Sequence, residues 1–356
     1  MLKAVLFNDT SVEDHHGCAI VIAQLLKGFS EQGVEVVRRV PLGMEQAAYD
    51  SLADWLAGMD LCVINGEGTM HDDAPAAMVL GEVAKFCASK GIPCFLLNSL
   101  WQDNQRLNEC LPCFTAAYFR DSASAAAASL FRQQVAVVPD LTLLTDFSAW
   151  QAAPRHGLLL NGSVLPEPRR ELMAYAFSDA PLGSEYMSIR CLPQLVGGSF
   201  TAWRYSLRQA IKGLRHWLQA CTLPMALSPQ RKQESRWRWR YARLQRSAFL
   251  ARIARAETVV SGRFHMVTLC VASHTPFLAV ASNTGKIQSL LADIGLNGRV
   301  YASFSAALKD ATVAPFTAEE IHLLEDYLAS ARASARQMFA DIALQASNGH
   351  RKSVAG

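Results

Sequence analysis

The sequence lacks any apolar run approaching the roughly 18 residues that a membrane-spanning helix needs. Its apolar start, residues 1–7, is ended by Asn8-Asp9-Thr10, too early for the hydrophobic region of a signal peptide. The net charge is only +3, and no RNA- or DNA-binding signature is present. The nine cysteines form an odd set without framework spacing, which is typical of a reducing compartment. Together these absences predict a soluble, cytoplasmic protein that does not bind nucleic acid.

One pair of cysteines, Cys110 and Cys113, does have the spacing of a redox dithiol motif. The pair does not follow a clear first strand of a thioredoxin-like unit, where such a motif is expected. We therefore favour two half-buried cysteines at a helix end, with a redox role as the alternative.

At 356 residues, 51% of them hydrophobic, the chain is long enough for two domains with a sizeable core each. In the N-terminal half, short apolar runs alternate with helical patterns, which is typical of a parallel sheet covered on both faces. The expected strands are 2–7, 34–40, 61–65, 93–98, 117–120 and 135–139, and the expected helices are 19–32, 46–57, 76–90 and 123–133. This pattern predicts a doubly wound α/β domain over residues 1–145.

Residues 140–155 have neither a helical nor a strand period, so we place the link between the domains there. The rest repeats the α/β pattern, with strands expected at 157–160, 185–191, 223–227, 258–261 and 277–281 and a helix at 203–220. Thr317-Ala318-Glu319-Glu320 is a helix start signal before a long amphipathic pattern that reaches about residue 345, with a frayed end from residue 348. We expect two Rossmann-like doubly wound domains, 1–145 and 156–356, facing each other across a cleft.

Three cationic residues occur where expected strands of the second domain meet helices. Gly262 ends a buried strand, and Arg263 and His265 then fall in the first turn of a helix. Lys286 follows Gly285 at the next such turn. Free N–H groups and the helix dipole favour an anion there, and all such turns lie on one edge of a parallel sheet. The three cations suit a phosphate and a carboxylate, with His265 able to exchange a proton near neutral pH.

Strand ends of the first domain carry further candidates. Gly66 and Gly68 flank Glu67 at the end of the third strand, where a carboxylate in a glycine-lined turn suits a general base. In the alternative interpretation the glycines only make the turn and Glu67 caps the next helix. Arg120 ends the fifth strand and suits a carboxylate or phosphate clamp, because its guanidinium is a planar fork.

The first loop leads to a helix that opens near Gly17, where glycine lets the backbone approach an anion or a sugar closely. Two groups could instead bind a metal: the vicinal pair His15-His16, and His71 with the two aspartates that follow it. Adjacent residues on a turn seldom ligate one ion and no second matching cluster is visible, so we expect no metal. We assign Gly17, Gly66 and Gly68 to the site of the anionic ligand, called here the donor site, and Asn8, His15, His16 and His71 to the site of a second, sugar-like ligand, called the acceptor site.

Residues 231–255 carry nine basic residues against a single acidic one, interleaved with Trp237, Trp239, Tyr241 and Phe249. Basic and aromatic residues together suit an anionic membrane surface, or a lipid-linked glycan acceptor at that surface. The alternatives are a solvated helix face over packed aromatic residues, and nucleic-acid binding.

With these residues placed, the chain resembles the polysaccharide pyruvyl transferase family. The resemblance spans residues 1–300 and rests on Asn8 to Gly17, Asn65-Gly66-Glu67-Gly68-Thr69, Arg120-Asp121-Ser122, Pro139-Asp140, and above all Arg263-Phe264-His265 with Lys286. It implies a GT-B-like fold and transfer of pyruvate from phosphoenolpyruvate, as a ketal, onto a sugar of a cell-surface polysaccharide such as an exopolysaccharide or lipopolysaccharide. It also implies that Arg263, His265 and Lys286 form the phosphoenolpyruvate site.

Ketal formation requires a proton for the methylene carbon of the enol, a base for the attacking hydroxyl, and cations for the carboxylate and the departing phosphate. His265 would be the acid, Glu67 the base, and Arg120, Arg263 and Lys286 the anion clamps, with phosphoenolpyruvate as donor substrate and no cofactor. Two alternatives stay open: a glycosyltransferase with a nucleotide-sugar donor on the same frame, and a non-catalytic glycan-binding protein.

Overall fold

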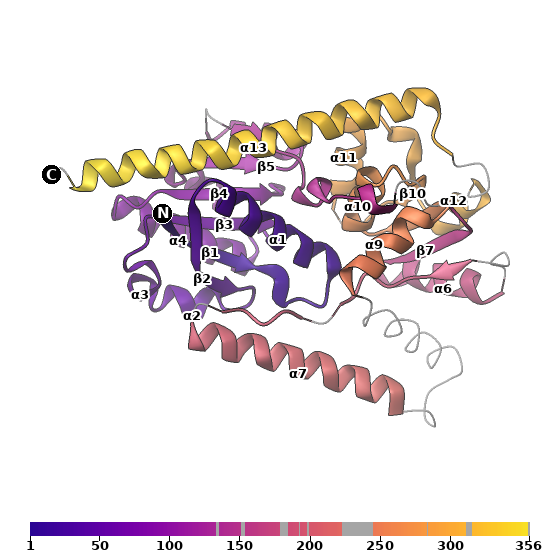
Figure 1. The fold of residues 1–356 in the computed structure, drawn as a ribbon, viewed down its shortest axis with the longest axis horizontal. Coiled ribbons are helices and arrows are strands. Elements are labelled where there is room, and N and C mark those ends of the chain that lie inside the picture. The colour runs from indigo at the N-terminus through magenta and orange to yellow at the C-terminus, as the bar shows by residue number, and fades with distance from the viewer. Residues whose placement is uncertain are drawn as a thin grey trace.

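Two parallel β-sheets, each covered by helices, make up the computed structural model (Figure 1). It describes residues 1–132, 135–150, 154–178, 184–191, 193–197, 199–222, 245–282, 284–310 and 315–354. The two sheets confirm the predicted α/β class. The chain passes from the first sheet to the second between Val137 and Leu158, where the link between domains was expected.

The first sheet has the strand order β2-β1-β3-β4-β5-β6, and all its strands are parallel. Its strands are β1 (Leu2–Asp9), β2 (Val34–Pro41), β3 (Leu61–Glu67), β4 (Cys94–Ser99), β5 (Ala116–Phe119) and β6 (Val135–Val137). Every residue of β3 and β4 is buried, as expected for strands covered on both faces. All six strands confirm the sequence pattern.

The helices of this half are α1 (His16–Glu31), α2 (Glu45–Tyr49), α3 (Leu52–Leu56), α4 (Pro75–Ser89) and α5 (Ser122–Ser129). The single helix expected over residues 46–57 is wrong, because the chain forms two short helices there. The Ser51 hydroxyl between them donates to the carbonyl of Ala47 (3.4 Å), a local bond that bends a helix. Cys110 is buried inside a 3-10 helix, Leu107–Cys113, and Cys113 is half-buried at its end. The expectation of two half-buried cysteines at a helix end is therefore right for Cys113 only.

The second sheet has the order β11-β10-β9-β7-β8, again parallel throughout. Its strands are β7 (Leu158–Ser163), β8 (Glu185–Tyr186), β9 (Thr258–Gly262), β10 (Phe277–Val280) and β11 (Val300–Tyr301). β11 was not predicted, and the strand expected at 223–227 lies outside the described residues. The strand expected over 185–191 ends at Tyr186, because the chain then turns to the first domain: the carbonyl of Ile189 accepts from the backbone N–H of His16 (2.9 Å).

The helices of this half are α6 (Pro166–Ser178), α7 (Phe200–Thr222), α9 (Arg246–Arg255), α10 (Phe264–Ala272), α11 (Lys286–Ile294), α12 (Phe304–Asp310) and α13 (Ala318–Val354). The start signal of α13 is confirmed as a capping box. Thr317 N–H donates to Glu320 Oε2 (2.9 Å), and Glu320 N–H donates to Thr317 Oγ1 (3.2 Å). The fraying expected from residue 348 is wrong for the backbone, which stays helical to Val354.

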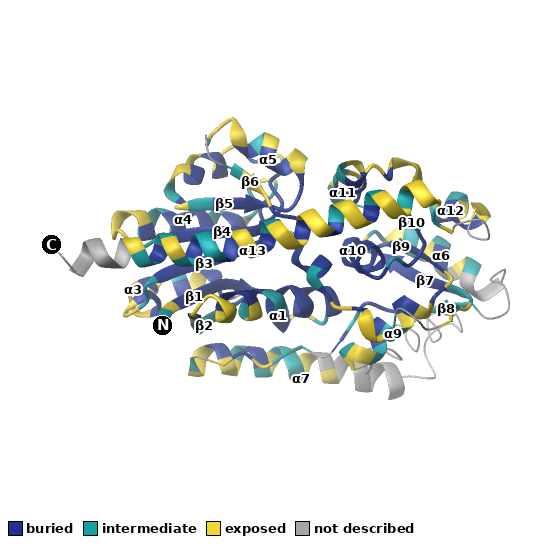
Figure 2. Ribbon diagram, turned by 45° about the horizontal axis from the view of Figure 1, so that its top comes forward, coloured by how far each residue is buried: buried dark blue, intermediate teal, exposed yellow. Residues whose placement is uncertain are grey.

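α13 lies along both halves of the molecule, and buried and exposed residues alternate along it (Figures 1 and 2). Near its start, Leu324 and Leu328 belong to the core around the second sheet. Further on, Phe339 and Ile342 belong to the core around the first sheet. The ring of Phe339 packs against α1 at Gly28, where a Cβ would overlap it. One helix thus takes part in the cores of both halves.

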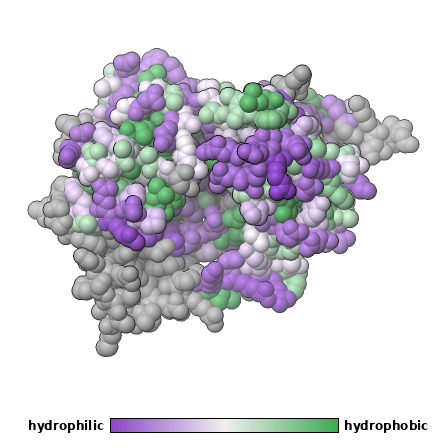
Figure 3. Space-filling model, turned by 180° about the vertical axis from the view of Figure 1, so that it is seen from behind, coloured by the Kyte–Doolittle hydropathy of each residue, from purple (hydrophilic) through white to green (hydrophobic). Residues whose placement is uncertain are grey.

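Of the basic aromatic segment 231–255, the structure describes residues 245–255 only. They include α9, whose Phe249 and Ile253 are buried in the core of the second sheet and whose Arg252 pairs with Glu185. On the face seen in Figure 3, a broad hydrophilic group lies beside smaller hydrophobic groups. In the described part of the chain, no helix is both long enough and apolar enough to cross a bilayer. Contact of residues 231–244 with lipid stays a prediction.

Candidate active site

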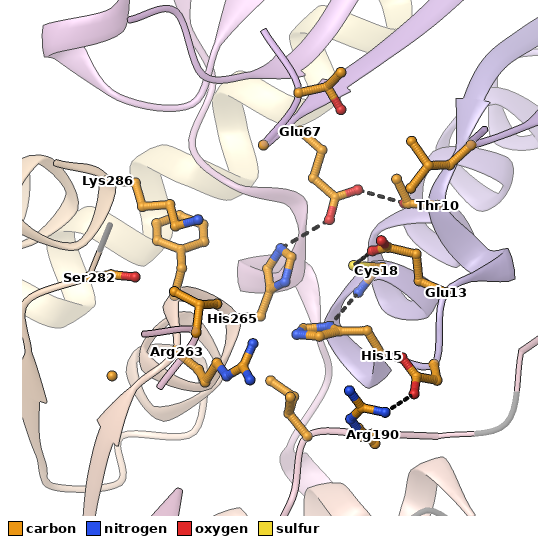
Figure 4. Close-up of a pocket in the computed structure, with 18 of the residues that line it drawn as sticks. Thr10, Glu13, His15, Cys18, Glu67, Arg190, Arg263, His265, Ser282 and Lys286 are labelled. Atoms are coloured by element: carbon orange, nitrogen blue, oxygen red, sulfur yellow. Dashed lines mark hydrogen bonds and ion pairs between the residues drawn. The ribbon is translucent and has the colours of Figure 1, made fainter. Parts of the chain in front are cut away.

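A pocket of about 360 Å³, called here the cation pocket, lies between the two sheets at the ends of their strands (Figure 4). The carboxyl ends of parallel strands are where ligands bind in such folds. Its wall includes Thr10, Glu13, His15 and Cys18 after β1, Glu67 and Gly68 at the end of β3, Arg120 after β5, Arg263 and His265 after β9, and Ser282 and Lys286 after β10.

Glu67 and His265 face each other in this pocket although they come from different sheets (Figure 4). Glu67 Oε1 lies 3.6 Å from His265 Nε2. Glu67 Oε2 accepts hydrogen bonds from the Thr10 hydroxyl (2.6 Å) and from Asn65 Nδ2 (3.1 Å). The backbone of Glu67 is left-handed, with φ 38°, which is uncommon for a residue with a side chain. This turn therefore directs the carboxylate at the imidazole.

A second carboxylate, that of Asp140, faces the same imidazole nitrogen. Asp140 Oδ2 lies 3.7 Å from His265 Nε2 and 3.8 Å from Arg120 Nη1. Asp140 Oδ1 accepts bonds from the backbone N–H (3.0 Å) and hydroxyl (2.5 Å) of Thr142. Burial alone would raise the pKa of Asp140, but the facing His265 and Arg120 hold that pKa at about 2. Asp140 is therefore a carboxylate at neutral pH, and a protonated His265 would lie between two negative charges.

Arg120 is the most deeply buried cation of the pocket, with 2% of its surface exposed. Its guanidinium stacks on the ring of Phe264, 4.4 Å from guanidinium carbon to ring centroid. Two of its nitrogens, Nε and Nη2, are buried without a hydrogen-bond partner. Unpaired buried donors on a charged group are costly, so they indicate a place where an anionic ligand binds.

Lys286 and Arg263 enter the cation pocket from the second domain, on the side of His265 (Figure 4). Burial, together with the positive charges of Arg120 and Arg263, lowers the pKa of Lys286 to about 8. The backbone N–H of Arg263 donates to Ser261 Oγ (3.0 Å), which fixes the turn into α10. Three crowded cations in one pocket favour an anion with several oxygens.

His15, Cys18 and Glu13 form the N-terminal wall. His15 Nδ1 accepts a bond from the backbone N–H of Cys18 (3.3 Å) and so caps α1, while burial and then His265 lower the pKa of His15 well below its usual value. Burial raises the pKa of the Cys18 thiol, which contacts Glu13 Oε2 (Sγ–Oε2 3.3 Å). Loss of water around its carboxyl, and then the Glu67 charge, raise the pKa of Glu13 to about 7, although the residue as a whole is exposed to solvent.

Ligand atoms of His15, Cys18 and His265 lie within 4.8 Å of one another. Two imidazoles and a thiol of this kind could hold a zinc ion. Such an ion would occupy His265 and would itself deprotonate the Cys18 thiol on binding. The three fully buried thiols of Cys62, Cys87 and Cys94 also lie close together, but in the core of the first sheet and outside the pocket wall.

Asn8 lies beneath the pocket rather than in its wall. The residue is buried at the end of β1 with φ 60°. Its Nδ2 donates to the carbonyl of Asn65 (2.6 Å) and to Thr69 Oγ1 (3.0 Å). Asn8, which was assigned to the acceptor site, thus bonds to both ends of the turn that carries Glu67.

Two further predicted histidines also lie outside the pocket wall. His16 is buried and stacks on Phe249, with ring centroids 4.1 Å apart, and burial followed by Arg246 lowers the pKa of His16 to about 4. His71 Nδ1 contacts Asp72 Oδ2 (2.7 Å) in the loop after β3. His15 is therefore the one residue of the predicted acceptor set that the described pocket wall includes.

Two of the three predicted glycines lie behind the wall, where space is tight. A Cβ on Gly17 would overlap the Cβ and ring of His265, and a Cβ on Gly66 would overlap Ser99. These glycines permit the close approach of neighbouring elements. Gly68 does line the pocket, with no atom near its missing Cβ.

Sequence reasoning assigned no role to Thr10, Glu13 or Arg190. Thr10 and Glu13 stand in the loop after β1, so the rule that strand ends carry function could have found them. Arg190 forms an ion pair with Asp14, 176 positions earlier in the chain, and both residues line the pocket (Figure 4). No local pattern reveals a pair of this separation.

A family model described as polysaccharide pyruvyl transferase matches residues 15–284. The chain belongs to the polysaccharide pyruvyl transferase family. As a member of the pyruvyl transferase family it is an enzyme, a transferase that modifies polysaccharide. The matched range contains Glu67, Arg120, Arg263 and His265 and ends two residues before Lys286.

Solved structures with a similar fold include the following two. The S. aureus MnaA–UDP structure has 9% identity and a TM-score of 0.54, over 91% of this chain and 90% of that chain. A Listeria monocytogenes structure assigned as UDP-N-acetylglucosamine 2-epimerase has 10% identity and a TM-score of 0.51, over 99% and 97%. At these identities the likeness shows the fold alone, a GT-B-like pair of α/β domains. A comparison of this pyruvyl transferase family member with curated proteins found no match.

Proposed function

We propose that this enzyme transfers pyruvate from phosphoenolpyruvate onto a sugar, as a ketal, during synthesis of a cell-surface polysaccharide such as an exopolysaccharide or lipopolysaccharide. The observation that carries the proposal is the buried Arg120 guanidinium, whose Nε and Nη2 have no partner in a pocket shared with two more cations. Phosphoenolpyruvate offers a phosphate and a carboxylate a few bonds apart, which fits several convergent cations better than a single anionic group does.

In this mechanism Arg120, Arg263 and Lys286 bind the phosphate and the carboxylate. His265 gives its proton to the methylene carbon, which becomes a methyl group and leaves C2 electrophilic. A sugar hydroxyl then forms a bond to C2 and loses its proton to a carboxylate of the pocket. The C2–O bond to phosphate breaks, with the electron pair leaving on the phosphate, whose charge the cations stabilise. A second hydroxyl of the same sugar closes the ketal, and its proton leaves with solvent or phosphate.

Two pocket carboxylates are placed to receive the hydroxyl proton, Glu67 and Glu13. Glu67 was predicted as the base from its glycine-lined turn, and it lies 3.6 Å from His265. A carboxylate that close to the imidazole also suits orientation of His265 and stabilisation of its charge. Glu13 has a pKa of about 7, suited to taking a proton at neutral pH.

The proposal needs phosphoenolpyruvate as substrate and a saccharide or lipid-linked saccharide as acceptor, with no metal or cofactor. The enzyme would act in the cytoplasm, with residues 231–255 able to bind the inner membrane. The rival donor is a nucleotide sugar, as the UDP in the S. aureus structure suggests.

Radiolabelled phosphoenolpyruvate and a panel of radiolabelled UDP-sugars, each incubated with purified enzyme and cell-envelope saccharide extract, separate the two donors. We expect label from phosphoenolpyruvate in the saccharide fraction, with one inorganic phosphate released per pyruvate transferred. Label from a UDP-sugar, with phosphoenolpyruvate untouched, would show that the cation pocket serves a diphosphate instead. Binding of saccharide without consumption of any donor would favour a glycan-binding protein.

A further inference from the structure

A second pocket, of about 370 Å³, adjoins the cation pocket. Glu13, Asp14, Leu42 and Arg190 line both pockets and so form a common wall. The rest of the second pocket comes mainly from the loop after β2 and from α7, elements to which the proposed reaction assigns no role. Its volume is in the range of small-molecule sites.

The second pocket combines apolar and hydrogen-bonding residues and is nearly balanced in charge. From α7 it receives the phenol of Tyr205, the amide of Gln209 and the ammonium of Lys212. Asp14 and Arg190 neutralise each other in an ion pair. A ring of hydrogen-bonding groups without an excess of cations suits an uncharged polyhydroxyl ligand, in contrast to the cation pocket.

The apolar residues of the second pocket agree with the same ligand class. Leu42 and Pro193 offer a surface for the C–H face of a sugar ring. Gly43 has φ 86°, and a Cβ there would overlap the Tyr205 hydroxyl, so glycine permits α7 to approach the β2 loop. The shape of the pocket therefore depends on residues without a role in the cation pocket.

Two carboxylates, those of Glu13 and Asp14, line both pockets, and Asp14 forms the ion pair with Arg190. The Glu13 carboxylate accepts from the weak donor Cys18 Sγ (3.3 Å), which leaves it able to accept a proton. Glu67 lines the cation pocket alone, and its oxygens are engaged by Thr10, Asn65 and His265. Glu13 thus differs from Glu67 in two ways: it lines both pockets, and its carboxylate has no strong hydrogen-bond donor among the described residues.

Building on the proposed pyruvyl transfer, we propose that the second pocket binds the acceptor hexopyranose and that Glu13 is its general base. The O–H bond of the attacking hydroxyl breaks, its proton goes to the Glu13 carboxylate, and the oxygen forms the bond to C2 of the protonated enol. Glu67 then acts as the positioning partner of His265. The anionic donor would thus bind in the cation pocket, and the uncharged acceptor would bind in the neighbouring second pocket.

Kinetics with p-nitrophenyl hexopyranosides as acceptor probes and phosphate release as readout test the pocket assignment. We expect Gln209→Ala and Lys212→Ala each to raise the KM for the hexoside about tenfold, a loss of one hydrogen-bonding group. The KM for phosphoenolpyruvate should stay within twofold of wild type. Arg208→Ala is the matched control, because Arg208 is an exposed cation of the same helix that lines neither pocket. Equal effects of Lys212→Ala and Arg208→Ala would overturn the pocket assignment.

Glu13→Gln tests the base. We expect kcat to fall roughly 10²–10⁴-fold, with phosphoenolpyruvate binding, measured by calorimetry, unchanged. Wild-type kcat in Glu13→Gln, with Glu67→Gln inactive, would return the role to Glu67. Binding of phosphoenolpyruvate by wild type without turnover of any hexoside would overturn the saccharide assignment alone. Failure of wild type both to bind phosphoenolpyruvate and to release phosphate would overturn the proposed function beneath it.

Discussion

Gly17 lies directly against His265, so that a Cβ on Gly17 would overlap the Cβ, Cγ and Nδ1 atoms of the histidine. The two residues belong to α1 and α10, helices that follow strands of different sheets. A glycine assigned to donor binding on sequence grounds therefore sets the position of the proposed acid.

Gly17→Ala is expected to displace the His265 ring and to lower kcat by roughly 10²-fold, because a shift of about 1 Å at a reacting group can cost that much. The KM for phosphoenolpyruvate should change less, since Arg120 is untouched. Gly298→Ala is the control, as no atom lies within 4 Å of its missing Cβ. Wild-type kcat in Gly17→Ala, with thermal stability preserved, would mean that the contact is not needed.

His265→Gln is expected to lower kcat by roughly 10²–10⁴-fold, because the side chain can no longer transfer a proton. Calorimetry should show that phosphoenolpyruvate still binds, and circular dichroism that the fold is intact. Turnover near the wild-type level on the confirmed acceptor would reduce the cluster to an anion-binding patch.

Arg263→Ala and Lys286→Ala are expected to raise the KM for phosphoenolpyruvate. Each variant loses a charge-assisted contact of about 1.5–3 kcal/mol, or roughly one to two orders of magnitude in affinity. Lys309→Ala serves as the control, because this exposed lysine of α12 lies outside the pocket wall. A purely catalytic defect, with unchanged donor KM, would contradict the role of clamp.

The pH dependence of kcat/KM for phosphoenolpyruvate should be bell-shaped with a narrow optimum. Below about 7 the Glu13 carboxyl is protonated and cannot act as base, so the rate falls as the pH falls. Above about 8 Lys286 loses its proton and its charge, so the rate falls as the pH rises. Lys286→Arg should move the alkaline limb to higher pH, because arginine stays charged. An unchanged alkaline limb in Lys286→Arg would assign it to another group.

EDTA should leave turnover unchanged, because side-chain cations supply every positive charge that the proposed mechanism uses. The measurement is phosphate release before and after dialysis against the chelator. Loss of activity that added Zn²⁺ restores would instead identify His15, Cys18 and His265, whose ligand atoms lie within 4.8 Å of one another, as a catalytic metal site.

The strands of the first sheet and the strand-end positions of Glu67, Arg120 and His265 follow from local sequence pattern. Apolar runs bounded by glycine mark strands, and the ends of parallel strands converge whatever their separation along the chain. The second pocket was not predictable in this way. It forms because the chain leaves the second sheet after Tyr186 and places α7 beside the β2 loop, a tertiary path that no periodicity records.

The same limit explains why the positions of Gly17, Gly66 and Asn8 relative to the pocket were not predicted from the sequence. Sequence shows that a glycine stands near a helix start, but not whether a ligand or another helix fills the space beside it. For Gly17 and Gly66 the space is filled by His265 and Ser99. Asn8 likewise bonds to the turn of Glu67 and not to the pocket, because its left-handed backbone turns the side chain towards Asn65.

Helix α1 is held at both ends by glycine contacts with later parts of the chain, at Gly17 by His265 and at Gly28 by Phe339 of α13. The other end of α13 is seated among the residues that surround the second sheet. A hinge that opened the two domains would therefore have to bend this long helix or slide α1 along it. Glu67 and His265 are far apart in the sequence, and the packing of α1 and α13 holds them close to each other even before a substrate binds. The active site is thus preorganised: folding already aligns Glu67 with His265, so that substrate binding does not have to supply the free energy for this alignment at each turnover.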